Sequence, residues 1–148
     1  MSTEQQFCTF FLGGLFFGVE VHKVQEVIRY QGMTAVPLAP EVVGGLINLR
    51  GQIVTAIDLR RRLGLEARAE GEQPMNVVVR AEGGAVSLLV DEIGDVVEVE
   101  ESAHEATPDT LQGISRELIR GVYKLKERLL LLLDTERTLD LGGATGDA

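Results

Sequence analysis

The chain has 148 residues, of which 45% are hydrophobic and 25% charged, with one cysteine and a formal net charge of −9. This length suits about one domain, the single cysteine excludes an intrachain disulfide, and the acidic balance argues against nucleic acid or anionic lipid as a partner. The first residues lack the basic and apolar regions of a signal peptide, and no apolar run approaches the ~18 residues of a membrane span, so we expect a cytoplasmic protein without direct membrane insertion.

Short apolar runs separated by glycine turns predict β-hairpins along most of the chain, because glycine readily adopts the positive φ of a tight connection. The expected turns are at Gly13-Gly14, at Gly51, at Gly83-Gly84 and, without a turn glycine, between the runs 119–125 and 129–133. Many short strands with few helices predict a mostly β fold of the antiparallel barrel type.

Three short helices interrupt this pattern. The first is expected over residues 21–28, where four apolar residues recur at three- and four-residue spacing: Val21, Val24, Val27 and Ile28. The second covers 59–63, with Asp58 at its N-cap and Gly64 just beyond its end. The third covers 135–141, with Leu139 as its apolar anchor.

The remaining segments are expected to be loops and tails. Residues 1–6 and 142–148 have little to bury and should be flexible at the N-terminus and disordered at the C-terminus. Pro37 and Pro40 bracket an extended loop, and 66–74 is a surface loop. Residues 102–115 are expected to be an extended crossing segment with a short helical turn, since Pro108 argues against one continuous helix.

Charged clusters in the sequence have plain structural explanations. The basic run Arg60-Arg61-Arg62 is too short for a nucleic-acid contact and is interpreted as a solvated helix face. An acidic set lacks the ligand register and glycine of an EF-hand and is interpreted as a solvated edge beside a strand. The acidic residues are Asp91, Glu92, Asp95, Glu98, Glu100 and Glu101.

Motifs for catalysis are not found in the sequence. Neither His22 nor His104 has a cysteine or a second histidine at ligand spacing, and Cys8 begins an apolar strand, where a thiol behaves as a small hydrophobe. There is no Gly-x-Ser-x-Gly elbow and no phosphate-binding loop. We therefore expect no enzyme, no metal and no cofactor. A small-molecule-binding barrel, or a hydrolase using Asp58, Asp91 or Asp95, remains an alternative.

Two segments resemble the CheW family of bacterial chemotaxis coupling proteins. They are VGGLINLRGQIVTAIDLR at 43–60 and GVEVHKVQEV at 18–27, and the resemblance extends from about residue 7 to 139. It implies two small five-stranded SH3-like barrels packed side by side, with a groove between them, within a CheW-like domain at 7–141.

The resemblance also implies a function. Such a protein is a non-enzymatic adaptor that binds the cytoplasmic helical tip of a chemoreceptor, a methyl-accepting chemotaxis protein, and the regulatory domain of a CheA-type histidine kinase. Its partners would recruit it to membrane receptor arrays. A coupling protein of a chemotaxis-like pathway for pili, biofilm or development is also compatible with the sequence.

Six positions match those that border the receptor-binding groove in that family: Val24, Glu26, Val27, Gly44, Asn48 and Arg50. The planar guanidinium of Arg50 could pair with the carboxylate of Glu26 and shape the groove wall. Alternatively, Asn48, Arg50 and Gly51 only build the turn, and both valines belong to the core. The kinase-facing residues are not assigned; we expect them on a separate, apolar barrel face.

Overall fold

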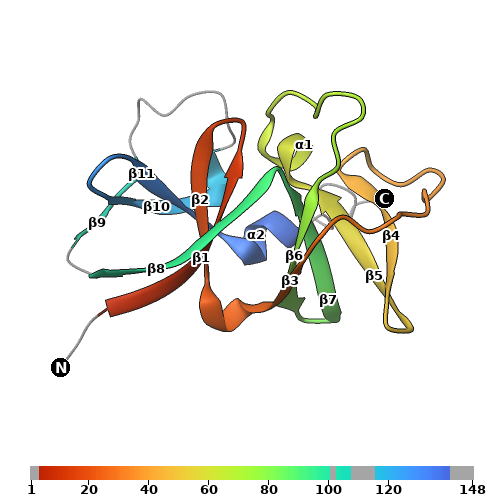
Figure 1. Ribbon diagram of the computed structural model, residues 1–148, viewed down its shortest axis with the longest axis horizontal. Helices are drawn as coiled ribbons and strands as arrows, with labels where there is room; N and C mark the ends of the chain where they lie inside the picture. The colour runs from red at the N-terminus through yellow and green to blue at the C-terminus, as the bar shows by residue number, and fades with distance from the viewer. Residues whose placement is uncertain (1–3, 101–102, 108–115, 141–148) are drawn as a thin grey trace.

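The computed structural model describes residues 4–100, 103–107 and 116–140. These residues form two β-sheets with a few short helices (Figure 1). The red and blue ends of the chain share the sheet on the left, here called the terminal sheet, and the orange-to-green middle forms the central sheet on the right. The mostly β fold expected from the sequence is therefore confirmed.

The terminal sheet has six strands in the order β8-β1-β2-β11-β10-β9, where five were expected. Its strands are β1 (Glu4–Leu12), β2 (Leu15–Glu20), β8 (Glu92–Glu100), β9 (His104–Glu105), β10 (Ile119–Lys124) and β11 (Leu129–Leu133). All neighbours pair antiparallel except β2 and β11, which are parallel.

The central sheet has five strands in the order β3-β6-β7-β5-β4. They are β3 (Val24–Ile28), β4 (Val43–Leu49), β5 (Gln52–Asp58), β6 (Met75–Ala81) and β7 (Gly84–Val90). Thr34, in the loop that follows edge strand β3, exchanges two 2.8 Å backbone hydrogen bonds with Leu46 of the opposite edge strand β4. This contact curls the sheet and brings its two edges toward each other.

The chain crosses between the sheets at two short connections. The first is the 3₁₀ turn η1 (Val21–Lys23), which leads from β2 to β3. The second is a single residue, Asp91, because β7 ends at Val90 and β8 begins at Glu92. The central sheet is thus one continuous segment inserted between the two parts of the terminal sheet.

Two of the hairpin turns show the backbone that their glycines predict. Gly13 and Gly14 have φ of 56° and 82°, and Arg50 and Gly51 have φ of 52° and 89°. Positive φ at both central positions is the type I′ signature, which matches the twist of the flanking strands. In the third hairpin Ala81 pairs with Gly84, so that the turn lies one residue earlier than expected.

Two of the three expected helices are present. They are α1 (Leu59–Leu63) and α2 (Thr135–Leu139), and Gly64 ends α1 in the left-handed conformation with φ of 83°. A further 3₁₀ turn, η3 (Arg116–Leu118), precedes β10. Asp134 caps α2 by accepting a 3.0 Å hydrogen bond from the backbone N–H of Arg137. Asp58 occupies the N-cap position of α1, but its side chain makes no capping hydrogen bond.

The helix expected over 21–28 was wrong. Only Val21–Lys23 turns, as η1, and Val24–Ile28 is a strand that pairs antiparallel with β6. A helical spacing over so few residues is weak evidence, since most helical stability comes from tertiary packing. The β-branched residues of this segment suit a strand. The open edge of β6 supplied the backbone hydrogen bonds that decided the conformation.

Two further expectations need correction. The fold is not purely antiparallel, because β5 pairs parallel with β7 and β11 pairs parallel with β2. Strand β1 begins at Glu4, inside the segment 1–6 that was expected to be flexible, because β8 pairs with it as far as Glu100. The tail 142–148 lies outside the described residues, as do residues 102 and 108–115 of the expected crossing segment 102–115.

The largest hydrophobic core lies between the sheets and takes residues from both. It includes Phe10 and Phe17 of the terminal sheet and Val77 and Leu88 of the central sheet. Each sheet also encloses a smaller cluster of its own, one around Tyr123 and the other within the central sheet. The two sheets are therefore separate in backbone hydrogen bonding but share most of their buried apolar surface.

Candidate functional site

Glu26 and Arg50 face each other across the two edges of the central sheet. Glu26 belongs to edge strand β3, and Arg50 lies in the turn that follows the opposite edge strand, β4. The guanidinium Nη2 of Arg50 donates a hydrogen bond to Oε2 of Glu26. The pairing expected from the sequence is confirmed, and it is a second contact between the two edges of the sheet beside that of Thr34 with Leu46.

The hydrogen bond also sets the ionisation of both groups. The bond from Arg50 holds the pKa of Glu26 below its ordinary value, and the same bond raises the pKa of Arg50. Both groups are therefore charged across the physiological range. The side chain of Arg50 is 71% exposed, whereas that of Glu26 is 21% exposed, so the guanidinium presents free donors to a partner.

Asn48 supports the turn that carries Arg50. Its side-chain Oδ1 accepts a 2.8 Å hydrogen bond from the backbone N–H of Gly51. Arg50 itself has φ of 52°, a left-handed conformation that strains a residue with a side chain. Asn48 and Gly51 are thus turn residues, as one interpretation held, whereas the guanidinium of Arg50 has the further contact with Glu26.

The two valines of β3 divide between core and surface. Val24 is partly buried and packs against the main core, whereas Val27 is 39% exposed. Gly44 is exposed, but a Cβ at this position would come within 2.8 Å of Cδ1 of the buried Leu89. Packing against Leu89 is therefore one reason for a glycine here. Asn48 is exposed as well. We call the side chains of Val27, Glu26 and Arg50, which are available for contacts with a partner, the edge surface.

A groove of about 830 Å³ separates the central sheet from helix α2 and opens to solvent. One wall is made by Ile53, Thr55 and Val86, and the other by Thr135 and Leu139 of α2. None of the six expected residues lines it. The groove adjoins them at two places, because Lys23 precedes Val24 and Ile53 pairs with Asn48.

Ile53 is the residue that sequence reasoning missed. Its side chain is 62% exposed at the mouth of this inter-sheet groove. The alternation along β5 contained the signal, since Val54 and Ala56 are buried and Ile53 and Thr55 must face the other way. A large apolar side chain at an outward position indicates a contact surface.

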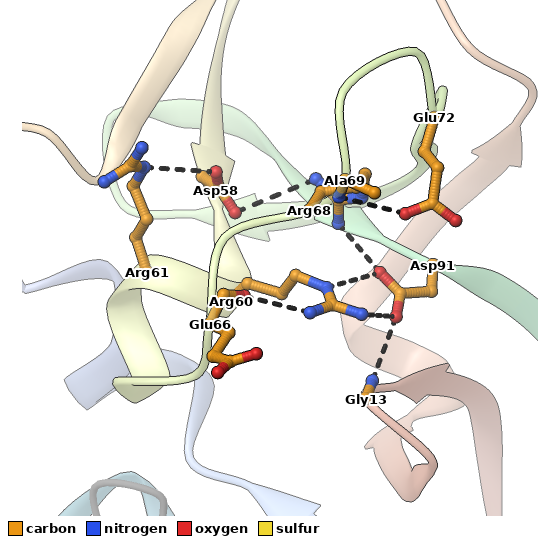
Figure 2. Close-up of polar contacts among 9 residues, drawn as sticks. All are labelled: Gly13, Asp58, Arg60, Arg61, Glu66, Arg68, Ala69, Glu72 and Asp91. Atoms are coloured by element: carbon orange, nitrogen blue, oxygen red, sulfur yellow. Dashed lines mark hydrogen bonds and ion pairs between the residues drawn. The ribbon is translucent and has the colours of Figure 1, made fainter.

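The three arginines of α1 do not form a solvated face. Figure 2 shows that Arg60 points at Asp91, with Nε donating to Oδ1 at 2.9 Å and Nη2 to Oδ2 at 2.6 Å. Arg68 and the backbone N–H of Gly13 complete the shell of Asp91 at 3.0 and 2.9 Å. The side chain of Arg60 is only 16% exposed. The interpretation of this run as a solvated face was wrong for Arg60, because the helix packs at the crossing between the sheets, whereas the side chain of Arg61 is 43% exposed.

Asp91 is correspondingly not a member of a solvated acidic edge. Burial raises the pKa of its carboxyl, but Arg60, the N–H of Gly13 and Arg68 together outweigh burial and hold that pKa below its ordinary value. A carboxylate neutralised in this way is a poor general base. The carboxylate of Asp58 lies between Arg61 at 3.6 Å and Arg68 at 3.9 Å (Figure 2).

Other candidate chemical groups are also accounted for. Burial raises the pKa of the Cys8 thiol, so that the reactive thiolate is rare at neutral pH. Within residues 4–100, 103–107 and 116–140, no three His, Cys, Asp or Glu residues are placed to hold a metal ion. None of the helices in the described part of the chain is long and apolar enough to cross a membrane.

Comparisons with known proteins point to one family. The model of the CheW-like domain matches residues 6–142. The chain is 31% identical over 135 residues to the chemotaxis protein CheW of Klebsiella aerogenes, which covers 91% of this chain and 81% of that protein. It is 30% identical over 140 residues to the chemotaxis protein CheW of Bacillus subtilis, with coverage of 95% and 90%.

A solved structure matches over nearly the same extent. The crystal structure of the scaffolding protein TtCheW from Thermoanaerobacter tengcongensis superimposes with a TM-score of 0.83 at 26% sequence identity. The match covers 94% of each chain. The overall fold of the chain is thus similar to that of this scaffolding protein.

Proposed function

Because the chain belongs to the CheW-like domain family, we propose that it is a non-enzymatic adaptor of chemotaxis signal transduction. The observation that carries this function is the extent of the match: the family model spans residues 6–142, and curated relatives named chemotaxis protein CheW match over most of their own length. The open groove favours an adaptor over an enclosed ligand-binding barrel, and the pairing of Asp91 with arginines favours an adaptor over a hydrolase.

We propose further that two partners bind at different surfaces. One is the cytoplasmic helical tip of a chemoreceptor, and the other is the regulatory domain of a histidine kinase. A receptor helix would lie along the edge surface and bury Val27, since docking of the apolar face of a helix is an established mode of recognition. The exposed guanidinium of Arg50 can donate paired hydrogen bonds to a carboxylate of that helix.

The remaining expected residues support this surface indirectly. Asn48 holds the turn of Arg50, Gly44 keeps the backbone of β4 uncovered, and Val24 anchors β3 to the core. Ile53 extends the apolar contact from the edge surface into the inter-sheet groove. Recruitment to membrane receptor arrays would follow from receptor binding, without any membrane contact by the chain itself.

Reconstitution tests the adaptor function. The purified chain, a soluble fragment of the cognate receptor and the kinase are mixed pairwise and together, and complexes are separated by size. An adaptor yields a ternary complex that the receptor fragment and the kinase do not form without it. A kinase–receptor complex of equal yield in its absence would contradict the function, as would micromolar ATP binding by the chain in titration calorimetry.

Competition tests the separate surfaces. A peptide of the receptor tip is added to the preformed complex of the chain with the kinase regulatory domain. We expect the kinase to remain bound while the peptide binds. Displacement of the kinase in proportion to peptide occupancy would mean that the two partners share one surface.

A further inference from the structure

Helix α1 is five residues long and carries three consecutive arginines, two of which reach out of the central sheet into the terminal part of the fold. We propose that Arg60 and Arg62 are positioning residues that hold the two sheets in one relative orientation and thereby keep the inter-sheet groove in its binding shape. This inference rests on the proposed function, because the groove adjoins the surface assigned to the receptor.

Arg60 fixes the crossing point between the sheets. Its guanidinium binds both oxygens of Asp91, the single residue that joins β7 to β8. Asp91 in turn accepts from the N–H of Gly13 at 2.9 Å and donates its own N–H to the carbonyl of Phe11 at 3.0 Å. A rotation of one sheet against the other at this joint would break these contacts. Figure 2 shows those of Arg60, Arg68 and Gly13 converging on the Asp91 carboxylate.

Arg62 fixes helix α2. Its Nε donates to the carbonyl of Thr138 at 2.8 Å and its Nη2 to the carbonyl of Arg137 at 2.7 Å. These carbonyls lie in the last turn of α2, where a cation is favoured, and that of Arg137 also accepts from the N–H of Asp140 at 3.2 Å. The helix follows directly from β11 of the terminal sheet, and Figure 1 shows it between the two sheets.

The same helix is a wall of the inter-sheet groove. Thr135 and Leu139 of α2 face Ile53 and Val86 of the central sheet across it. Whatever sets the position of α2 against the central sheet therefore sets the width of the groove. Arg62 is the described hydrogen-bond donor from α1 to α2, so its loss should free α2 to shift.

The chemistry of these arginine contacts indicates that they fix the orientation of the two sheets more than they raise the stability of the fold. Partly buried ion pairs lose much of their electrostatic gain to desolvation, and replacing them with apolar residues often leaves stability unchanged. Bidentate guanidinium contacts, by contrast, have a strong directional requirement. The apolar core between the sheets is non-directional and does not by itself fix the angle between them. The directional contacts of the two arginines can fix it.

Distance measurements test the inference. Spin labels are placed at Glu82 and Glu136, which border the groove on opposite sides, in a Cys8→Ser background. We expect a narrow distance distribution in the otherwise native chain and a broader, shifted one in Arg62→Ala and in Arg60→Ala. Arg62→Lys keeps a donor but loses the paired geometry, so the width of its distribution should lie between those of the native chain and Arg62→Ala. It also serves as the second variant if Arg62→Ala does not fold.

Arg61→Ala is the matched control on the same helix. Its side chain is 43% exposed, and its described partners, Asp58 and Glu41, belong to the same part of the chain as α1. It should leave the distance distribution unchanged. Unchanged distributions in both Arg60→Ala and Arg62→Ala, or equal broadening in Arg61→Ala, would overturn the inference.

Binding of the receptor tip to the unlabelled variants completes the test. We expect about tenfold weaker binding for Arg62→Ala and little change for Arg61→Ala. A broadened distribution with unchanged binding would overturn the positioning role. If the native chain itself fails to bind the receptor tip, the proposed function fails instead, and the distance data still decide whether the two arginines orient the sheets.

Discussion

Arg50 combines a strained backbone with an exposed functional side chain, and the two properties can be separated by substitution. Arg50→Gly removes the guanidinium but also the penalty of a left-handed φ, because glycine adopts φ near 52° freely. We expect its melting temperature to equal or exceed that of Arg50→Ala, which keeps the strain. Thermal unfolding followed by circular dichroism measures the difference.

Both substitutions should weaken receptor binding to a similar degree. An arginine central to an interface can contribute a factor of roughly thirty in affinity. Glu26→Ala should also weaken binding, and the double variant should lose less than the sum of the single losses if the residues act as a pair. Unchanged receptor binding alongside a large loss of thermal stability would make Arg50 a turn residue alone.

The stability of the fold depends on the negative charge of Asp91. Its pKa is lowered in the folded protein, so its ion pairs stabilise the fold fully above the unfolded pKa of about 4 and less as the pH falls through the folded pKa. Asp91→Asn should cost about 2–3 kcal/mol in the free energy of unfolding near pH 7, since Arg60 and Arg68 lose the carboxylate that both of them contact.

Denaturant unfolding at several pH values checks this. The difference in unfolding free energy between the native chain and Asp91→Asn should be constant above about pH 5 and should shrink below about pH 4. Glu41→Gln is a suitable control, because Glu41 pairs with Arg61 through a side chain that is 87% exposed. A difference that does not depend on pH would show that Asp91 does not act through its charge.

At the scale of elements, strand β3 carries both a core side chain and a contact side chain. Val24 packs against the main core, whereas Val27 is exposed at the edge surface. We expect Val24→Ala to lower the free energy of unfolding by about 1–2 kcal/mol and Val27→Ala to change it by about 0.5 kcal/mol or less. Chemical denaturation of the two variants measures both values.

For receptor binding we expect the opposite order, with the larger loss in Val27→Ala. Val27→Ala removes apolar surface from the proposed contact and should weaken binding, whereas Val24→Ala should affect binding only through stability. If Val27→Ala binds the receptor tip as well as the native chain does, then β3 is an edge strand without a receptor contact.

At the scale of the whole molecule, the shared core predicts cooperative unfolding. The two sheets have separate hydrogen-bond networks, but the largest cluster of buried side chains draws on both. We expect a single thermal transition with equal calorimetric and van't Hoff enthalpies, and loss of amide protection in both sheets together.

A substitution in one sheet should then destabilise the other. Leu63→Ala, which opens a cavity beside the central sheet, should lower amide protection in β10 and β11 of the terminal sheet as well. Two separate transitions, or a loss of protection confined to the central sheet, would show that the sheets are independent folding units.

Local features of the fold could be predicted from the sequence alone. The glycines at 13, 14, 51 and 64 specify positive φ, and the short apolar runs between turns specify strands, since both depend on neighbouring residues only. Resemblance to a family supplied the positions Glu26 and Arg50, and the complementary chemistry of guanidinium and carboxylate predicted their pairing, which spacing alone could not.

Only the tertiary structure decided the rest. Residues 24–28 carry a spacing that suits a helix, and the open edge of β6 made them a strand. The arginines of α1 resemble a solvated face in sequence, and their partners Asp91 and the carbonyls of α2 lie 31 and 75–76 residues away. Contacts between residues so distant in sequence depend on how the sheets pack, and local propensity carries no information about that packing.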